Sequence, residues 1–218
     1  MFFVLFSLLF NIGKQNVGAA EFSGHFALEP RFFLQSPLSD RQHGMGNFSF
    51  VVQPEFYHEW ADGDMSLTIV PYLRLDQHDS QRTHFDFREF LLQTVGDRWE
   101  LRIGLGVVFW GVTESQHLVD VINQTDLVES PDGEEKLGQP MVNFTWISRW
   151  GTLNFFVLSF FRERTFPGEK GRLRFPLPVD AGKSDAEGRH VDWAIRWSET
   201  LGDFDIGLSH FYGTDRRV

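Results

Sequence analysis

The chain has 218 residues, which is enough for one domain or one medium-sized β-barrel. It carries 30 Asp and Glu residues against 20 Lys and Arg residues, and this acidity argues against a nucleic-acid partner, because phosphate binding needs a basic surface. It has 24 Phe and no Cys, and past residue 12 no apolar run reaches the roughly 18 residues that a membrane-spanning helix needs. A membrane β-barrel remains compatible with this composition, because half of each strand faces a polar lumen.

The first segment has the features of an export signal. Residues 2–10 form an apolar run, and small residues follow at Gly18, Ala19 and Ala20. This order predicts a secretory signal peptide over residues 1–20, with cleavage near Ala20. No positive charge precedes Phe10, so a misassigned or missing start is one explanation. A buried strand or a short anchor helix is the alternative.

After residue 21 the sequence alternates between apolar and polar residues with the period of two that is typical of β-strands. In residues 65–76, for example, Leu73 and Leu75 alternate with Tyr72, Arg74 and Asp76. The alternation slips near Glu89, which indicates a β-bulge. Nine strands are predicted, at residues 22–34, 48–60, 65–76, 84–95, 98–108, 140–149, 152–162, 189–199 and 204–212.

The connections between these strands alternate in length. Tight turns are expected at 60–65, 95–98, around 150 and at 200–204, and longer links at 35–46, 77–83, 109–139 and 163–188. Bacterial outer-membrane barrels sort their connections in this way, whereas a soluble β-sandwich has no reason to do so. We therefore expect an all-β fold, an antiparallel up-and-down transmembrane β-barrel over residues 21–218. A soluble lipocalin-like barrel, apolar inside and polar outside, is the alternative.

The number of predicted strands is odd, whereas bacterial single-chain barrels have even numbers. The sequence analysis therefore predicts an incomplete barrel, the N-terminal part of a longer, truncated chain. A miscounted first strand, leaving eight strands, is the alternative. Trp60, Trp99, Trp150 and Tyr212 lie near predicted strand ends, as expected for an aromatic girdle at the membrane interfaces.

The long link 109–139 is a candidate for a loop folded into the lumen, where it would narrow a pore. Its apolar residues Leu118, Val119, Ile122 and Leu127 are expected to anchor it to the wall, and its polar residues to face water. An ordinary external loop is the alternative. The expected water-facing residues of the loop are Glu114, Asp120, Asn123 and Asp126, and the expected pore-lining residues of the wall are Arg74, Asp76, Arg88, Arg102 and Arg196.

Three short motifs carry a family resemblance. They are Trp110-Gly111, Glu114-Ser115 and the run Val121-Ile122-Asn123-Gln124-Thr125-Asp126. A strand that ends in Trp-Gly and runs into an Ile-Asn-x-x-Asp loop resembles uncharacterised porin-like outer-membrane proteins of Gram-negative bacteria. The resemblance is close over residues 98–165 and elsewhere extends only to the pattern. It implies a barrel and transport, but no substrate and no catalytic residue.

The expected function is therefore a passive, porin-like channel for small solutes in the bacterial outer membrane. Its expected partners are the lipid bilayer and lipopolysaccharide. A basic cluster that includes Arg162, Arg164, Arg172 and Arg174 could bind lipopolysaccharide phosphate or attract an anionic solute, and an ordinary solvated loop is the favoured alternative. A homo-oligomer is possible. A structural or adhesive barrel that acts through its external loops is one alternative, and a barrel-hosted lipid hydrolase is another. No catalytic, cofactor or metal site is predicted, since Ser115, His117 and Asp120 are adjacent only in sequence and a triad is defined by geometry.

Overall fold

The computed structural model describes residues 3–5, 8–17, 20–110, 120–176 and 190–216. Within these residues the chain forms strands and loops, and a 3-10 turn, Ala61–Gly63, is the one helical segment. No described helix is long and apolar enough to span a membrane. The strands are β1 (Phe3–Leu5), β2 (Leu8–Val17), β3 (Ala20–Phe33), β4 (Gly46–Trp60), β5 (Met65–Asp76), β6 (His84–Gly96), β7 (Trp99–Gly106), β8 (Gln139–Ser148), β9 (Gly151–Leu158), β10 (Asp192–Leu201) and β11 (Phe204–Tyr212).

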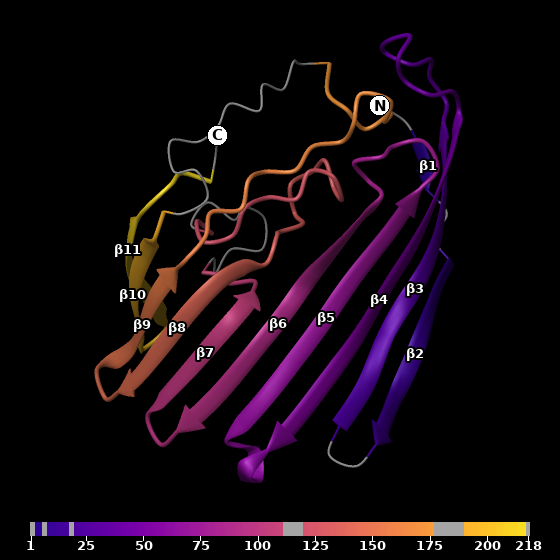
Figure 1. Ribbon diagram of the computed structural model, residues 1–218. Helices are drawn as coiled ribbons and strands as arrows, with labels where there is room; N and C mark the ends of the chain where they lie inside the picture. Colours follow the sequence, from indigo (N-terminus) through magenta and orange to yellow (C-terminus); the bar gives the residue numbers. More distant parts are fainter. Residues whose placement is uncertain (1–2, 6–7, 18–19, 111–119, 177–189, 217–218) are drawn as a thin grey trace.

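All of these strands belong to one curved antiparallel sheet (Figure 1). From β3 to β11 each strand pairs with the next along the chain, so the nine strands predicted from the sequence are confirmed in an up-and-down order. β1 and β2 pair with β3 along its other edge, with Leu5 opposite Arg31 and Leu8 opposite Leu28. Residues 8–17 thus form a strand within the segment expected to be a signal peptide, and the signal peptide itself stays a prediction.

The predicted alternation of short and long connections is confirmed. β4 and β5 are joined by the 3-10 turn, and two-residue turns join β6 to β7, β8 to β9 and β10 to β11. Gly202, in the last of these turns, has φ +63°, a conformation that glycine adopts at no steric cost. The long connections 34–45, 77–83, 107–138 and 159–191 all leave the other end of the sheet, where their described parts gather (Figure 1).

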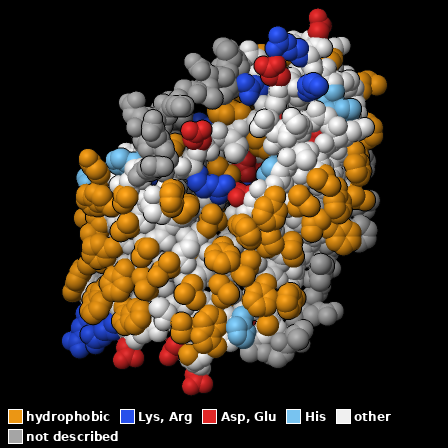
Figure 2. Space-filling view, viewed as in Figure 1, with side chains coloured by type: hydrophobic (Ala, Val, Ile, Leu, Met, Phe, Trp, Pro, Cys, Tyr) orange, Lys and Arg blue, Asp and Glu red, His pale blue; other side chains and the backbone are white. Residues whose placement is uncertain are grey.

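The two faces of the sheet differ sharply in polarity. One face, here called the apolar face, exposes large hydrophobic side chains over many strands, and Figure 2 shows them spread across the sheet with other atoms between them. The opposite face, called the polar face, buries charged and amide side chains beneath the long connections. The apolar face includes Phe48, Leu73, Phe90, Ile103, Val142, Phe155, Val157, Trp193 and Leu208, and the polar face includes Arg31, Asn47, Ser49, Arg74, Asn143 and Asp192.

A β-bulge lies where the sequence predicted one. Val70 of β5 pairs with Glu89 of β6, but Pro71 pairs with Phe87, so Arg88 is an extra residue on β6. Proline lacks an N–H group and cannot complete a regular ladder, which suits it to such a position. Because of the extra residue, Arg88 lies against the polar-face residue Tyr72, with its guanidinium carbon 4.1 Å from the ring centroid.

Part of the long connection completes a small core on the polar face. Ile122 is fully buried and packs with Trp110, Met141, Phe156 and Leu158 of the adjoining strands and strand ends. The prediction that Ile122 anchors the connection to the wall is therefore confirmed. Leu118 and Val119, the other anchors expected nearby, lie outside the described residues.

Candidate functional site: charged contacts between the polar face and the long connection

Residues 120–138 of the long connection lie on the polar face and are attached there by acidic residues. Glu129 is the centre of the largest contact. Its carboxylate accepts hydrogen bonds from the Tyr72 hydroxyl, at 2.6 Å, and from the Arg74 Nε, at 3.0 Å. A second guanidinium nitrogen of Arg74 lies 2.7 Å from the same carboxylate. The His84 ring nitrogen Nε2 is 3.4 Å away on β6.

Arg74 also connects Glu129 to a third strand. Its Nη1 donates to Glu29 of β3 at 2.8 Å, so one guanidinium lies between an acid on the wall and an acid on the long connection. The side chains of Arg74 and Glu129 are each only 5% exposed. Breaking a buried ion pair by removing one partner is costly, because the other charge stays buried. This contact therefore holds the long connection firmly on β5.

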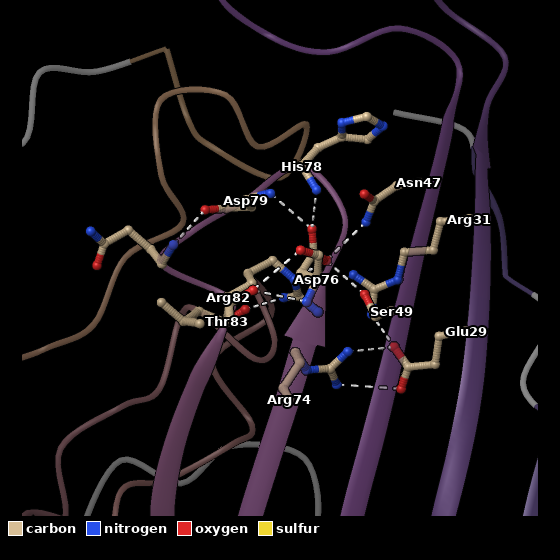
Figure 3. A network of polar contacts seen from close by, with 12 residues as sticks. Glu29, Arg31, Asn47, Ser49, Arg74, Asp76, His78, Asp79, Arg82 and Thr83 are labelled. Atoms are coloured by element: carbon tan, nitrogen blue, oxygen red, sulfur yellow. Dashed lines mark hydrogen bonds and ion pairs between the residues drawn. The ribbon is translucent and has the colours of Figure 1, made fainter.

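Asp76, at the end of β5, organises the neighbouring loop rather than lining an open space. Its carboxylate accepts hydrogen bonds from Ser49 at 2.6 Å and Asn47 at 2.9 Å on β4 (Figure 3). It also accepts the backbone N–H groups of His78 and Asp79, and it forms an ion pair with Arg82 at 3.3 Å. Arg82 in turn donates to the backbone carbonyls of Val128 and Glu129. The loop 77–83 is thus hydrogen-bonded to the long connection through Arg82.

Arg88 and Asp126 form a second attachment. Arg88 Nη1 donates to Asp126 Oδ2 at 2.9 Å, and the Thr165 hydroxyl donates to Asp126 Oδ1 at 2.6 Å. Burial would by itself raise the pKa of Asp126, but the hydrogen bonds from Thr165 and Arg88 outweigh it and hold the pKa below its ordinary value. Asp126 is therefore an ionised group that joins β6 to two separate connections.

Asn123 attaches the start of the long connection to the strand ends. Its amide group accepts the Val108 N–H at 2.8 Å and donates to the carbonyls of Gly106, at 2.9 Å, and Leu137, at 2.8 Å. These bonds satisfy backbone groups at the ends of β7 and β8 that would otherwise be buried without partners. The expectation that Asn123 and Asp126 face water is wrong, because they are 3% and 1% exposed and bind the wall instead.

The remaining predicted residues are not part of the contacts of Glu129, Asp76 and Asp126 described above. Arg102 on β7 forms an ion pair with Glu100 of the same strand and keeps 41% of its side chain exposed. Arg196 on β10 lies 5.9 Å from the Trp110 ring centroid. Asp120 accepts the Trp110 backbone N–H, and Glu114 lies outside the described residues. Of the five predicted lining residues, Arg74, Asp76 and Arg88 are thus brought together under the long connection, and Arg102 and Arg196 are not.

Sequence reasoning missed Glu29, Arg82 and Glu129, which complete these contacts. Glu29 alternates with Leu28 in a predicted strand, so its place on the polar face was available from the pattern. Glu129 belongs to an acidic stretch, but nothing in the sequence pairs it with Arg74. Arg82 lies in a short loop without a periodic signal, and only the fold brings it to Asp76.

The basic cluster of residues 162–174 is folded into the molecule. Arg162 binds Asp86 of β6 at 2.9 Å, and Arg172 donates to the carbonyls of Gln35 and Gly44 at 2.6 and 3.1 Å. The backbone N–H of Gly168 donates to Asp79 at 3.0 Å. Connections 34–45, 77–83 and 159–176 therefore pack on one another above the polar face.

Some space remains between the long connection and the wall. A cavity of about 360 Å³ lies between β4, β5 and β6 and residues Glu134, Glu135 and Lys136. Its wall includes Gln53, Glu55 and Glu89. No group of three or more described His, Asp or Glu side chains is arranged to hold a metal ion. Charged and amide side chains therefore line a cavity that is open to one side.

Comparisons of the chain with protein-family models, with curated proteins and with solved structures found no match.

Proposed function

We propose that this chain is part of an outer-membrane β-barrel that acts as a porin-like, passive channel for small solutes. The observation that carries the proposal is the inverted polarity of the sheet. Charged residues are buried on one face, while the other exposes large hydrophobic side chains such as Phe90, Ile103 and Val157. A soluble barrel keeps its apolar residues inside, whereas lipid is the solvent that favours an apolar exterior.

The position of the long connection favours a channel rather than a purely structural barrel. It is fixed to the polar face by buried contacts of Arg74 and Arg88 with Glu129 and Asp126. In a closed barrel the polar face becomes the lumen, so the connection would narrow the passage. Such a constriction, lined by charges of fixed position, sets which solutes pass in known channels. The cavity beside Glu55, Glu89 and Lys136 is the passage we propose.

The outer membrane and its lipids follow as the proposed location and partners. Open sheet edges are not tolerated in lipid, because each unpaired backbone group there costs several kcal/mol. β11 lies at one end of the strand order, and β1 and β2 lie at the other. We propose that these edges are satisfied in the complete barrel. Lipopolysaccharide remains a proposed partner, although Arg162 and Arg172 are occupied by contacts within the chain.

Two measurements test the proposal in sequence. Gel mobility of boiled and unboiled protein from outer-membrane fractions should differ if the chain, alone or in its full-length form, makes a detergent-resistant barrel. Purified protein should then produce stepwise conductance in planar bilayers, with linear dependence on salt concentration. A soluble monomer without membrane association would contradict the membrane assignment. A heat-modifiable barrel without conductance would contradict the channel and leave the structural alternative.

A further inference from the structure

A second cavity, which shares only Lys136 with the proposed passage, lies between the long connection and the segment that follows β11. Its volume is about 270 Å³. Three cationic side chains line it, from three different parts of the chain: Lys136, Arg164 and Arg216. Phe211 and Val121 supply an apolar part of the wall. Its lining also includes Asp120, Asn123, Thr125, Gly213 and Asp215.

Arg216 is held in a fixed position in this wall. Its guanidinium lies 5.2 Å from the Phe161 ring centroid and 5.0 Å from that of Phe211. Nη1 binds the carboxylate of Asp192, and Nε donates to the Ile122 carbonyl at 3.3 Å. The side chain is 4% exposed. A buried arginine held on aromatic rings is pre-organised, so it loses little freedom when it binds a ligand.

One nitrogen of this buried guanidinium lacks a partner for its hydrogen bonds. Nη2 of Arg216 has no hydrogen-bond partner among the described residues. Buried polar groups are nearly always paired, and an unpaired cationic N–H group is especially unfavourable. Arg216 lines the cavity, while Nη2 itself is closed to solvent, so a ligand acceptor in the cavity would complete its hydrogen bonding after a small movement of the guanidinium.

Two neighbouring cations extend this donor set. The ammonium group of Lys136 donates one hydrogen bond, to Thr125 at 3.1 Å, and has two further hydrogens. Arg164 donates through Nε to Gln124 at 3.2 Å and through Nη2 to the Arg216 carbonyl. Asp192, Asp120 and Asp215 balance the three positive charges, so directed hydrogen bonds, rather than net charge, would select the ligand.

We propose that this cavity binds a small carboxylate-bearing solute. The carboxylate oxygens accept hydrogen bonds from Arg216 and from Lys136 or Arg164, since a guanidinium matches the carboxylate geometry. The short hydrocarbon part of the solute packs against Phe211 and Val121. This binding does not require a conducting pore, so its test does not depend on the proposed function.

Butyrate tests the proposal, with butyramide as its neutral counterpart of similar shape. Titration calorimetry on the folded full chain in detergent micelles should give saturable binding of butyrate and none of butyramide. Lys136→Met and Arg216→Lys should each weaken butyrate binding about tenfold, the effect of losing roughly 1.4 kcal/mol of a charge-assisted hydrogen bond. Arg216→Lys keeps a cation beside Asp192, which protects the fold.

Lys170→Met is the matched control, because Lys170 is an exposed lysine of the 159–176 segment that does not line the cavity. It should leave butyrate binding unchanged. Equal binding of butyrate and butyramide, no saturable binding to the folded wild-type chain, or equal weakening by Lys170→Met would each overturn the proposal. Circular dichroism of every variant, compared with wild type, ensures that a lost signal reports lost binding rather than lost structure.

Discussion

Arg88 and Asp126 form an ion pair at 2.9 Å between strand β6 and the long connection, 38 residues apart in sequence. Both side chains are largely withdrawn from solvent, at 13% and 1% exposed. The β-bulge at Arg88 makes this pair possible, because the extra residue lets Arg88 lie over the Tyr72 ring while the pairing of β5 with β6 continues. A local irregularity in one strand thus fixes the position of a distant loop.

Replacing Arg88 by methionine should destabilise the fold strongly. Arg88→Met leaves Asp126 buried without its cation, and breaking a buried pair in this way costs about 3–5 kcal/mol. Urea unfolding of the protein in micelles measures the change. Arg102→Met is the control, because Arg102 is half exposed and its pair with Glu100 is worth about 0–1 kcal/mol. Equal losses in the two variants would contradict a special role for the Arg88 pair.

The same contact predicts a dependence of stability on pH. The pKa of Asp126 is held below its ordinary value of about 3.9 in the folded state, so the unfolded chain binds the proton first as pH falls. The stabilisation is complete above the unfolded pKa and is lost as pH falls through the folded pKa. Asp126→Asn should remove this part of the profile below about pH 5. An unchanged slope there would show that Asp126 does not couple to folding.

Gly104 should not tolerate a side chain. Its φ is +137°, and an added Cβ would lie 2.0 Å from the backbone oxygen of Phe90 on the paired strand. The backbone conformation alone costs a residue other than glycine about 1–3 kcal/mol, and the clash adds to it. Gly104→Ala should therefore lower the free energy of unfolding by more than Gly44→Ala, whose Cβ would meet open space. Unfolding curves of the two variants in the same micelles make the comparison.

The membrane assignment predicts that the cost of an arginine on the apolar face depends on depth. Ile103 lies within β7 and is 43% exposed, whereas Leu201, on the same face, is 55% exposed beside the β10–β11 turn. In lipid, Ile103→Arg should cost about 2–4 kcal/mol, and Leu201→Arg about 0–1 kcal/mol. Unfolding in phospholipid vesicles measures both. If water covers this face, both substitutions should stay within about 0.5 kcal/mol of wild type.

Ion selectivity tests the lining role predicted for Arg102. Arg102→Glu replaces a half-exposed cation of the polar face by an anion, so a pore that passes Arg102 should become more permeable to cations. The reversal potential in a salt gradient across a planar bilayer should shift accordingly. Lys170→Glu, in an exposed loop, should shift it less. An unchanged reversal potential in Arg102→Glu would remove Arg102 from the lining.

Much of the strand pattern was predictable from the sequence. Period-two alternation located β3 to β11 within a few residues, because side chains on successive strand positions point to opposite faces. Gly and Asp residues marked the tight turns, and the slip near Glu89 marked the bulge at Arg88. These features are local, so a short stretch of sequence contains the information that decides them.

The charged contacts were only half predictable. The alternation placed Arg74, Asp76 and Arg88 on the polar face, but it did not show that loops cover them. Asp126 and Asn123 were expected to face water because polar side chains usually do, yet both are buried against the wall. Their partners come from β6, from strand ends and from Thr165, far away in the sequence.

The sequence by itself therefore determined the strands, the sorting of their connections and the two-faced character of the sheet. Only the tertiary structure decided which face is covered, which acid meets which arginine, and that Arg216 is buried beside a cavity with one nitrogen unpaired. The physical reason is range: strand periodicity depends on neighbouring residues, whereas the contacts of Glu129 with Arg74 and of Arg216 with Asp192 depend on how separate segments fold onto one sheet.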